Sequence, residues 1–276
     1  MDPAAIRDLI AQTGWYHSID LGHGIVTPGL SQNVIDRAYF PDVRGKSVLD
    51  IGAWDGLYSF WAENNGASRV VAMDRYVWGL DFVARQAYWQ SCAERGEYPD
   101  HDRDATDFFD ESLPGRRGFE IAKQVLDSSV EPYVADLSDV DPADVGTFDV
   151  VFCLGVLYHL PDVFGAIRTL RRITREVALI ETEAIEVPAL GERAVCEFLP
   201  GDQLNADFGN WFIVSAAALT GMCRAAGFSR VEVVQGPGVP SPAGPDSPLA
   251  RLRQRVRNAV PVAPPQRYRI VTRAYV

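Results

Sequence analysis

Three aspartates that each follow a short apolar run are the residues whose type and spacing are best suited to binding a ligand. Asp50, Asp74 and Asp136 occupy these positions, and the glycine-containing turn 52–56 directly follows the first of them. Carboxylates at strand ends accept hydrogen bonds from ribose hydroxyls or an adenine amino group, while a glycine turn lets the backbone approach the ligand. The pattern therefore predicts a site for an adenosyl ligand.

The composition of the turn argues against a dinucleotide. Trp54 stands where a pyrophosphate-binding loop needs its second glycine. Asp50 and Asp55 add negative charge beside the turn, which suits sulfonium and ammonium groups better than a pyrophosphate. We therefore expect a positively charged cofactor without phosphates.

The elements that must position these residues follow from the apolar periodicity. Strands are predicted at residues 47–51, 69–74, 132–136, 148–153, 177–181, 230–234 and 268–276, and helices at 57–65, 162–174 and 215–226. Alternating strands and helices predict an α/β domain with a mostly parallel sheet, whose ligands lie at the carboxyl ends of the strands.

Two segments interrupt this alternation, and a third precedes it. We expect residues 1–40 to form an N-terminal cap over the active site, and residues 41–276 to form the main domain. Residues 75–131 are predicted to form a helical insertion between the second and third strands, with helices near 77–95 and 116–129. Residues 236–266 are predicted to be a flexible linker rich in proline and glycine. The insertion and the linker are candidates for substrate control.

Charge and hydropathy exclude several classes of protein. The 276 residues carry 26 Lys+Arg and 37 Asp+Glu, and the net charge of −11 divides into −16 for residues 1–230 and +5 for residues 231–276. The negative charge of residues 1–230 repels the phosphate backbone of a nucleic acid, so nucleic acid is not an expected partner. The sequence contains neither a long apolar run nor a secretory signal pattern, which predicts a cytoplasmic protein without a membrane partner.

The strand-turn-helix motif from Val48 to Gly56, together with Asp74, Asp136 and residues 148–160 (FDVVFCLGVLYHL), resembles the class I S-adenosylmethionine-dependent methyltransferases. The resemblance implies a Rossmann-like α/β fold with a seven-stranded, mostly parallel sheet and an antiparallel last strand. It also implies S-adenosyl-L-methionine as the cofactor. The residues expected to bind it are Asp50, Gly52, Ala53, Gly56, Asp74, Arg75, Asp136, Leu137, Cys153 and Leu154.

Within this class, the sequence is similar to the branch that contains the tRNA wobble-uridine carboxymethyltransferase. The similarity lies in residues 155–159, 180–182, 199–202, 210–215 and 265–267. The resemblance implies that a lysine, a tyrosine and an arginine hold the extra carboxylate of that enzyme's carboxylated cofactor. Tyr158 and Arg267 match, but no lysine precedes Lys46, and the basic RNA-binding extension is missing. We therefore expect plain S-adenosylmethionine and a small-molecule acceptor.

Methyl transfer is an in-line displacement that requires alignment of the acceptor and, for a hydroxyl, removal of its proton. His159, beside Tyr158, is the expected base because it follows the fourth strand closely and imidazole titrates near neutrality. The expected acceptor is a hydroxyl oxygen of a secondary metabolite. The residues expected to contact this acceptor are Tyr16, His17, Glu181, Asn210, Trp211 and Arg267. No metal is expected, because the histidine spacing enforces no metal site.

Two alternatives remain open at this point. The first is a methyl- or carboxymethyltransferase acting on the wobble uridine of tRNA, and the second is a non-catalytic module that retains the cofactor fold for interaction. The sequence is compatible with a monomer or a homodimer, and with N- or C-methylation beside the expected O-methylation.

Overall fold

A computed structural model of the chain describes residues 1–31, 34–110, 112, 114–237, 239 and 263–276. These residues divide into two compact units. The first unit comprises residues 1–35 and 42–152, and the second comprises residues 36–41 and 153–276. Most of the linker predicted at 236–266 lies outside the described residues.

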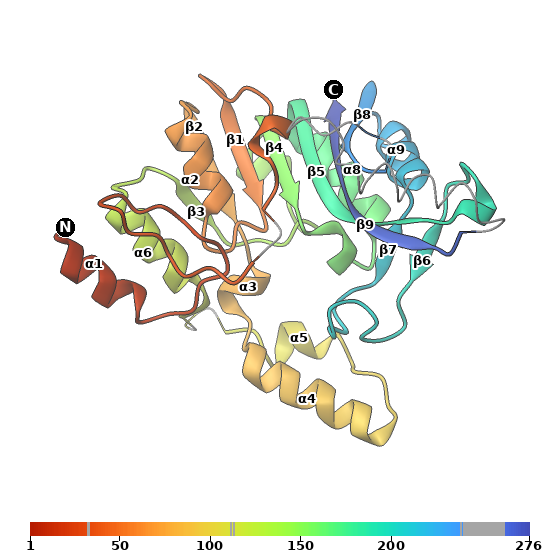
Figure 1. The fold of residues 1–276 in the computed structure, drawn as a ribbon, viewed down its shortest axis with the longest axis horizontal. Helices are drawn as coiled ribbons and strands as arrows, with labels where there is room; N and C mark the ends of the chain where they lie inside the picture. The colour runs from red at the N-terminus through yellow and green to blue at the C-terminus, as the bar shows by residue number, and fades with distance from the viewer. Residues whose placement is uncertain (32–33, 111, 113, 238, 240–262) are drawn as a thin grey trace. The chain divides into compact units, whose positions relative to one another are not determined.

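The first unit is built on strands in the spatial order β3-β2-β1-β4 (Figure 1). Their bounds are β1 (Ser47–Ile51), β2 (Arg69–Met73), β3 (Glu131–Tyr133) and β4 (Phe148–Leu154). Strand β1 runs parallel to β2, and β2 runs parallel to β3. Helix α2 (Leu57–Asn64) connects β1 to β2 and packs against both strands. The βαβ unit expected from the sequence is therefore present.

Strand β3 is shorter than predicted. Only Glu131–Tyr133 pair with β2, so Asp136 lies three residues beyond the strand, in the connection to the short helix α7 (Pro142–Val145). The prediction that Asp136 ends the third strand is corrected accordingly, because β2 itself ends at Met73 and offers no further partner.

The insertion between β2 and β3 is helical, as predicted, but it is divided more finely. Its elements are α3 (Tyr76–Gly79), α4 (Phe82–Arg95), α5 (Arg103–Thr106), η2 (Pro114–Arg116) and α6 (Arg117–Val125). The single helix expected near 77–95 is interrupted at Leu80, which is extended and bridges to Phe109. Asp81 then begins α4 by accepting a hydrogen bond from the amide of Ala84 at 2.9 Å. Figure 1 shows α4 and α5 standing away from strands β1–β3.

The N-terminal segment begins with helix α1 (Pro3–Ile10), which Asp2 caps by accepting a hydrogen bond from the amide of Ala4 at 2.9 Å. Helix α1 packs against α6 of the insertion. The indole nitrogen of Trp15 donates to the carbonyl oxygen of Ile10 at 3.1 Å, and this fixes the turn that leads away from the helix.

The second unit is built around the long strand β5 (Thr174–Glu186). Strand β7 (Phe212–Val214) pairs with β5 in parallel, and β6 (Cys196–Phe198) pairs with β7 in antiparallel orientation. Strand β9 (Gln266–Tyr275) runs antiparallel to both β5 and β8 (Arg230–Gln235). The antiparallel last strand is therefore confirmed. The remaining elements are η1 (Arg37–Tyr39), η3 (Leu157–His159), α8 (Val163–Ile173), η4 (Pro188–Leu190) and α9 (Ala216–Ala225).

The described residues form nine strands where seven were expected. The predicted fifth strand, 177–181, is longer at both ends, and its pairing with β9 from Val177 to Glu186 accounts for the longer carboxyl end. The carboxyl half of β5 also offers an edge on which Ala184 pairs with Val214 of β7. Strands β6 and β7 have three residues each, too few for an alternating pattern to show in the sequence.

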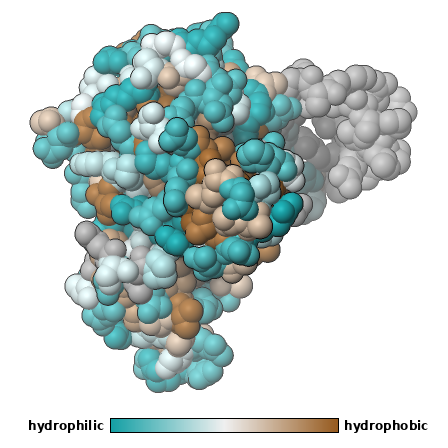
Figure 2. Space-filling view, turned by 90° about the vertical axis from the view of Figure 1, so that its left-hand side faces the viewer, coloured by the Kyte–Doolittle hydropathy of each residue, from teal (hydrophilic) through white to brown (hydrophobic). Residues whose placement is uncertain are grey.

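The surface is predominantly polar on the face shown in Figure 2, where hydrophobic residues form separate patches between larger hydrophilic areas. Among the described residues, no helix is both long enough and apolar enough to cross a membrane.

Candidate functional site

The turn that follows β1 has an unusual backbone. Gly52 and Gly56 have φ values of 72° and 88°, and Trp54 between them has a φ of 51°. A side chain on Gly56 would place its Cβ 2.6 Å from the ring of Phe60, so this position needs glycine. The amides of Gly52 and Ala53 donate to the carbonyl oxygen of Met73 at 2.8 and 3.1 Å. The turn is thus tied to the end of β2.

Two buried carboxyl groups flank this turn. Asp50 is only 1 % exposed and accepts a hydrogen bond from the Ser59 hydroxyl at 2.6 Å, and burial raises its pKa to about 7. Asp74 accepts hydrogen bonds from the amides of Trp54 at 3.0 Å and Val77 at 2.9 Å, and burial raises its pKa to about 6. Burial outweighs the hydrogen bonds that each carboxylate accepts, so a cationic or hydroxyl-bearing ligand would favour their charged forms.

Asp136, which follows β3, forms an ion pair with Arg75, which follows β2. The Arg75 Nη1 atom lies 3.0 Å from Asp136 Oδ2, and both side chains are 31 % exposed. The guanidinium carbon of Arg75 also lies 4.0 Å from the centroid of the Phe109 ring. An amino group that bonds to Asp136 would therefore share this carboxylate with Arg75 or displace it. Among the other expected cofactor residues, Leu137 and Cys153 are buried, and Leu154, which ends β4, is partly buried.

The N-terminal segment docks on the glycine turn within the first unit. The ring of Tyr16 stacks on Trp54 with centroids 3.9 Å apart. Asp55 Oδ2 accepts from the amides of Tyr16 and His17 at 2.9 and 2.8 Å, while its Oδ1 pairs with His17 Nδ1. Both carboxylate oxygens of the buried Asp55 thus bond to residues of the N-terminal segment. We correct the expectation that Asp55 supplies negative charge to a cofactor.

Replacing His17 by alanine is expected to lower the free energy of unfolding by about 2–4 kcal/mol, because it leaves the buried Asp55 carboxylate without its side-chain partner. Chemical denaturation measures this difference. The matched control is His23→Ala, which removes an exposed histidine from the same segment and should change stability by less than about 0.5 kcal/mol. Equal effects of the two substitutions would contradict the docking role of His17.

In the second unit, Tyr158 and His159 lie in η3 and contact the loop that precedes β7. His159 Nδ1 lies 3.0 Å from the carbonyl oxygen of Gly209, and the amide of Trp211 donates to the carbonyl oxygen of Tyr158 at 2.7 Å. The Tyr158 ring is buried in a cluster with Leu199 and Leu204 of this loop. The structure therefore brings together the predicted residues Tyr158, His159 and Trp211, with the fully buried Asn210 in the same loop.

A buried charge cluster joins β5 to β9. The Arg269 guanidinium binds Glu181 in a bidentate manner, with Nη2 2.6 Å from Oε2, and its Nη1 lies 2.9 Å from Glu183 Oε1. The Arg269 guanidinium carbon also lies 5.4 Å from the centroid of the Tyr158 ring. Burial disfavours the charged guanidinium, but the hydrogen bonds and charge of Glu181 outweigh it and raise the pKa of Arg269. This arginine is therefore held as a cation by carboxylates of the chain itself.

Arg267, the arginine predicted to contact the acceptor, lies at the surface. Its Nη2 is 3.0 Å from Glu197 Oε1, and its Nη1 donates to the carbonyl oxygen of Gln203 at 3.0 Å. Sequence reasoning missed Arg269, which lies two residues further along β9. The signal for it is the cross-strand register, because Arg269 stands opposite Glu183 and two residue pairs away from Glu181, on the same face of the sheet.

A family of proteins described as "Methyltransferase domain" matches residues 28–233. The chain belongs to this family. The match spans β1 to the middle of β8 and includes every expected cofactor residue. The resemblance to class I S-adenosylmethionine-dependent methyltransferases is confirmed, and S-adenosylmethionine is the cofactor expected of this family.

Relatives of this methyltransferase were found by sequence and by structure. It is 30 % identical over 234 residues to a tRNA U34 carboxymethyltransferase of Campylobacter jejuni subsp. jejuni serotype O:6, and 24 % identical to one of Campylobacter lari. The aligned segment covers 84 % of this chain, and the chain spans 62 % of the length of each relative. The N-terminal domain of EvdMO1 with SAH bound has a TM-score of 0.60 at 16 % identity, covering 100 % of this chain and 98 % of that one. This likeness confirms the α/β methyltransferase fold.

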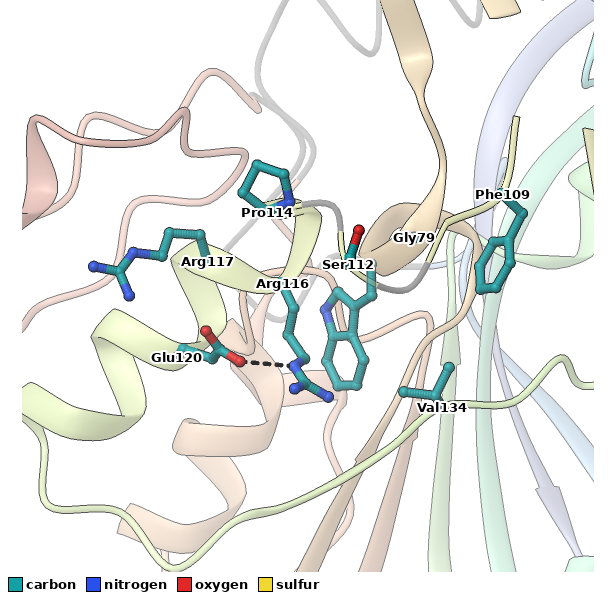
Figure 3. Close-up of a pocket in the computed structure, with 9 residues that line it drawn as sticks. Gly79, Phe109, Ser112, Pro114, Arg116, Arg117, Glu120 and Val134 are labelled. Atoms are coloured by element: carbon teal, nitrogen blue, oxygen red, sulfur yellow. Dashed lines mark hydrogen bonds and ion pairs between the residues drawn. The ribbon is translucent and has the colours of Figure 1, made fainter. Parts of the chain in front are cut away.

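The insertion of the methyltransferase contributes a cavity of about 330 Å³ to the first unit (Figure 3). Its lining residues are Trp78, Gly79, Phe109, Ser112, Pro114, Arg116, Arg117, Glu120 and Val134. Arg116 Nε donates to Glu120 Oε1 at 3.0 Å (Figure 3). The guanidinium carbon of Arg116 lies 5.6 Å from the centroid of the Trp78 ring. The lining is therefore mixed, with the aromatic rings of Trp78 and Phe109 beside the charged side chains of Arg116, Arg117 and Glu120.

Replacing Arg269 by methionine is expected to lower the free energy of unfolding by about 3–5 kcal/mol, because Glu181 is then left buried without its ion-pair partner. Arg267→Met is the matched control on the same strand, and it should cost about 1 kcal/mol or less because that ion pair is exposed. Urea denaturation of both variants gives the comparison. A cost for Arg269→Met no greater than for Arg267→Met would contradict the assignment of the buried cluster.

Proposed function

We propose that this chain transfers the methyl group of S-adenosylmethionine to a hydroxyl oxygen of a small-molecule acceptor. The proposal is carried by the carboxylate pairing of two of the three arginines of β9. Arg267 pairs with Glu197, and Arg269 pairs with Glu181 and Glu183. Cations held by the protein's own carboxylates are poor partners for the extra carboxylate of a carboxylated cofactor or for an RNA phosphate. This arrangement supports plain S-adenosylmethionine and an uncharged or cationic acceptor.

The chemistry of the buried acids in the first unit fits the cofactor. S-adenosylmethionine carries a sulfonium and an ammonium group, and both would favour the ionised form of Asp50. Asp74 is placed beside the glycine turn, where it can accept hydrogen bonds from ribose hydroxyls. Asp136 is proposed to accept from the adenine amino group, with Arg75 as its neighbour. We also propose that the remaining residues expected from the sequence contact the cofactor, namely Gly52, Ala53, Gly56, Leu137, Cys153 and Leu154.

His159 is the proposed general base. A backbone carbonyl can only accept a hydrogen bond, so the contact with Gly209 requires a proton on His159 Nδ1. In the neutral imidazole the lone pair is then on Nε2, which can take the hydroxyl proton of the acceptor. As the acceptor oxygen forms its bond to the methyl carbon, the bond from that carbon to the sulfonium sulfur breaks, and S-adenosylhomocysteine leaves.

The test combines binding with product formation. Isothermal titration should show S-adenosylmethionine binding to the full chain. S-adenosylhomocysteine release is then followed with hydroxylated metabolites and with bulk tRNA. D-fucose is a suitable first probe, since the N-terminal domain of EvdMO1 was crystallised in the presence of SAH and D-fucose. Release with a hydroxylated small molecule and none with tRNA supports the proposal. A lack of binding at near-millimolar S-adenosylmethionine would reject it.

The second candidate function is modification of the tRNA wobble uridine, and the observation in its favour is the similarity to tRNA U34 carboxymethyltransferases. Methylation or carboxymethylation of bulk tRNA at low salt would establish it in place of the small-molecule proposal. A chain that binds S-adenosylmethionine but releases no S-adenosylhomocysteine with any metabolite extract would instead be a non-catalytic module.

A further inference from the structure

The loop that faces His159 contains two adjacent residues in a backbone conformation that side chains disfavour. Asn205 and Ala206 have φ values of 59° and 53°, which places both in the left-handed region. Such residues persist only where the surrounding structure holds them, and they occur preferentially at functional sites. Both are exposed, so burial of their own side chains does not hold this turn.

Asn210 holds the turn instead. Its Nδ2 donates to the carbonyl oxygen of Leu204 at 2.7 Å and to that of Asp207 at 2.9 Å, and these two carbonyls flank the left-handed pair. The side chain is fully buried. Its orientation is fixed, because a flipped amide would place oxygen against two carbonyl oxygens. Asn210 is therefore a clamp across the turn.

The end of the clamped turn is the segment that contacts His159. The amide of Gly209 donates to Asp207 Oδ1 at 2.8 Å, which fixes the peptide next to the one whose carbonyl faces His159 Nδ1 at 3.0 Å. On the other side of Asn210, the amide of Trp211 donates to the carbonyl oxygen of Tyr158. The loop is thus bonded to two successive residues of η3, Tyr158 and His159. These bonds fix the direction in which the Gly209 carbonyl points.

From this geometry we infer that Asn210 is a positioning residue that sets the tautomer of His159. By clamping the turn, it keeps the Gly209 carbonyl against Nδ1, so that the proton stays on Nδ1 and the lone pair on Nε2. The effect on the tautomer does not depend on the proposed function. Its consequence for catalysis does, because the tautomer affects methyl transfer only if His159 is the base. It gives Asn210 a role distinct from the acceptor contact expected from the sequence.

The tautomer can be measured without any acceptor or cofactor. Nitrogen-15 NMR of the imidazole groups in the full chain resolves protonated from unprotonated nitrogens, and His159→Gln identifies the signals of His159 among the four histidines. We expect Nδ1–H in the wild type and a shift to Nε2–H as the major form in Asn210→Ala. The exposed Gln203→Ala is the matched loop control and should leave the tautomer unchanged.

A second variant separates the clamp from general loss of structure. Asn205→Gly relieves the left-handed strain, so the double variant Asn205→Gly/Asn210→Ala should regain Nδ1–H even if Asn210→Ala folds poorly. Nε2–H in the wild type, Nδ1–H retained in a folded Asn210→Ala, or Nε2–H in the folded double variant would each overturn the inference. Failure of His159 as a base would appear only in the methyl-transfer assay, so the two failures are distinguishable.

Discussion

Asparagine in place of Asp50 is expected to weaken S-adenosylmethionine binding about 10- to 100-fold, the range expected when one hydrogen bond to a charged group is lost. The same substitution should stabilise the ligand-free protein above pH 7. Both effects have one cause, since the carboxylate is buried with few partners until a cationic ligand is present. Asparagine retains an oxygen that can accept the Ser59 hydrogen bond, so the packing around β1 is preserved.

The pH dependence follows from the direction of the pKa shift. Burial raises the pKa of Asp50 from 3.8 to about 7, so the folded chain retains a proton that the unfolded chain releases between these values. The stability of the wild type therefore decreases as pH rises from about 4 to about 7, and this component is absent in Asp50→Asn. Affinity for the cationic cofactor should change in the opposite sense, rising with pH through about 7 in the wild type, and this component should be absent in Asp50→Asn.

Isothermal titration and urea denaturation between pH 5 and pH 8.5 measure both quantities. Asp149→Asn is the matched control, because Asp149 lies at the amino end of β4 in the same unit and accepts hydrogen bonds from the amide and hydroxyl of Ser47. Cofactor affinity should be unaffected by that change. If Asp50→Asn bound S-adenosylmethionine with wild-type affinity at pH 8, Asp50 would not be a cofactor residue.

The local part of the site was predictable from the sequence because it is encoded within a few residues. Strand β1, the glycine turn and helix α2 are consecutive, and Asp50 precedes the turn by two residues. Such a motif leaves its signal in composition and spacing. The position of Asp74 was predictable for the same reason, because the length of one βαβ unit fixes where β2 ends.

The partners of the charged residues were not predictable, because they depend on distant segments. Asp55 looks from the sequence like an acid free to face a cofactor, yet it pairs with His17, 38 residues away. Arg267 and Arg269 lie two residues apart on β9, and composition does not distinguish them. Only the register of β9 against β5 decides that Arg269 meets the buried Glu181 and that Arg267 reaches the surface.

These pairings also alter the interpretation of the charge in the second unit. The sequence shows a basic C-terminal region, which could be read as an anion-binding surface. Among the described arginines of β9, Arg267 and Arg269 are bound by glutamates, and Arg273 donates to the carbonyl oxygen of Tyr39 at 2.8 Å. The three arginines of β9 are therefore held by partners within the chain, and this supports our preference for a small molecule over an RNA as the acceptor.

His159→Gln is expected to lower the rate of methyl transfer to a hydroxyl acceptor by about 10²- to 10⁴-fold, the usual contribution of a positioned general base. Cofactor affinity should remain at the wild-type value, since the proposed base acts on the acceptor. S-adenosylhomocysteine release under single-turnover conditions measures the chemical step.

His23→Gln controls for the loss of a histidine, because His23 is exposed in the N-terminal segment and its replacement should leave the rate unchanged. His159→Ala with added imidazole gives a second criterion, since a small base can restore proton transfer where a lost structural contact would not be restored. A wild-type rate in His159→Gln would show that the acceptor loses its proton without this base. In that case the acceptor is a more acidic or already deprotonated group, and the proposed hydroxyl would be replaced by that class.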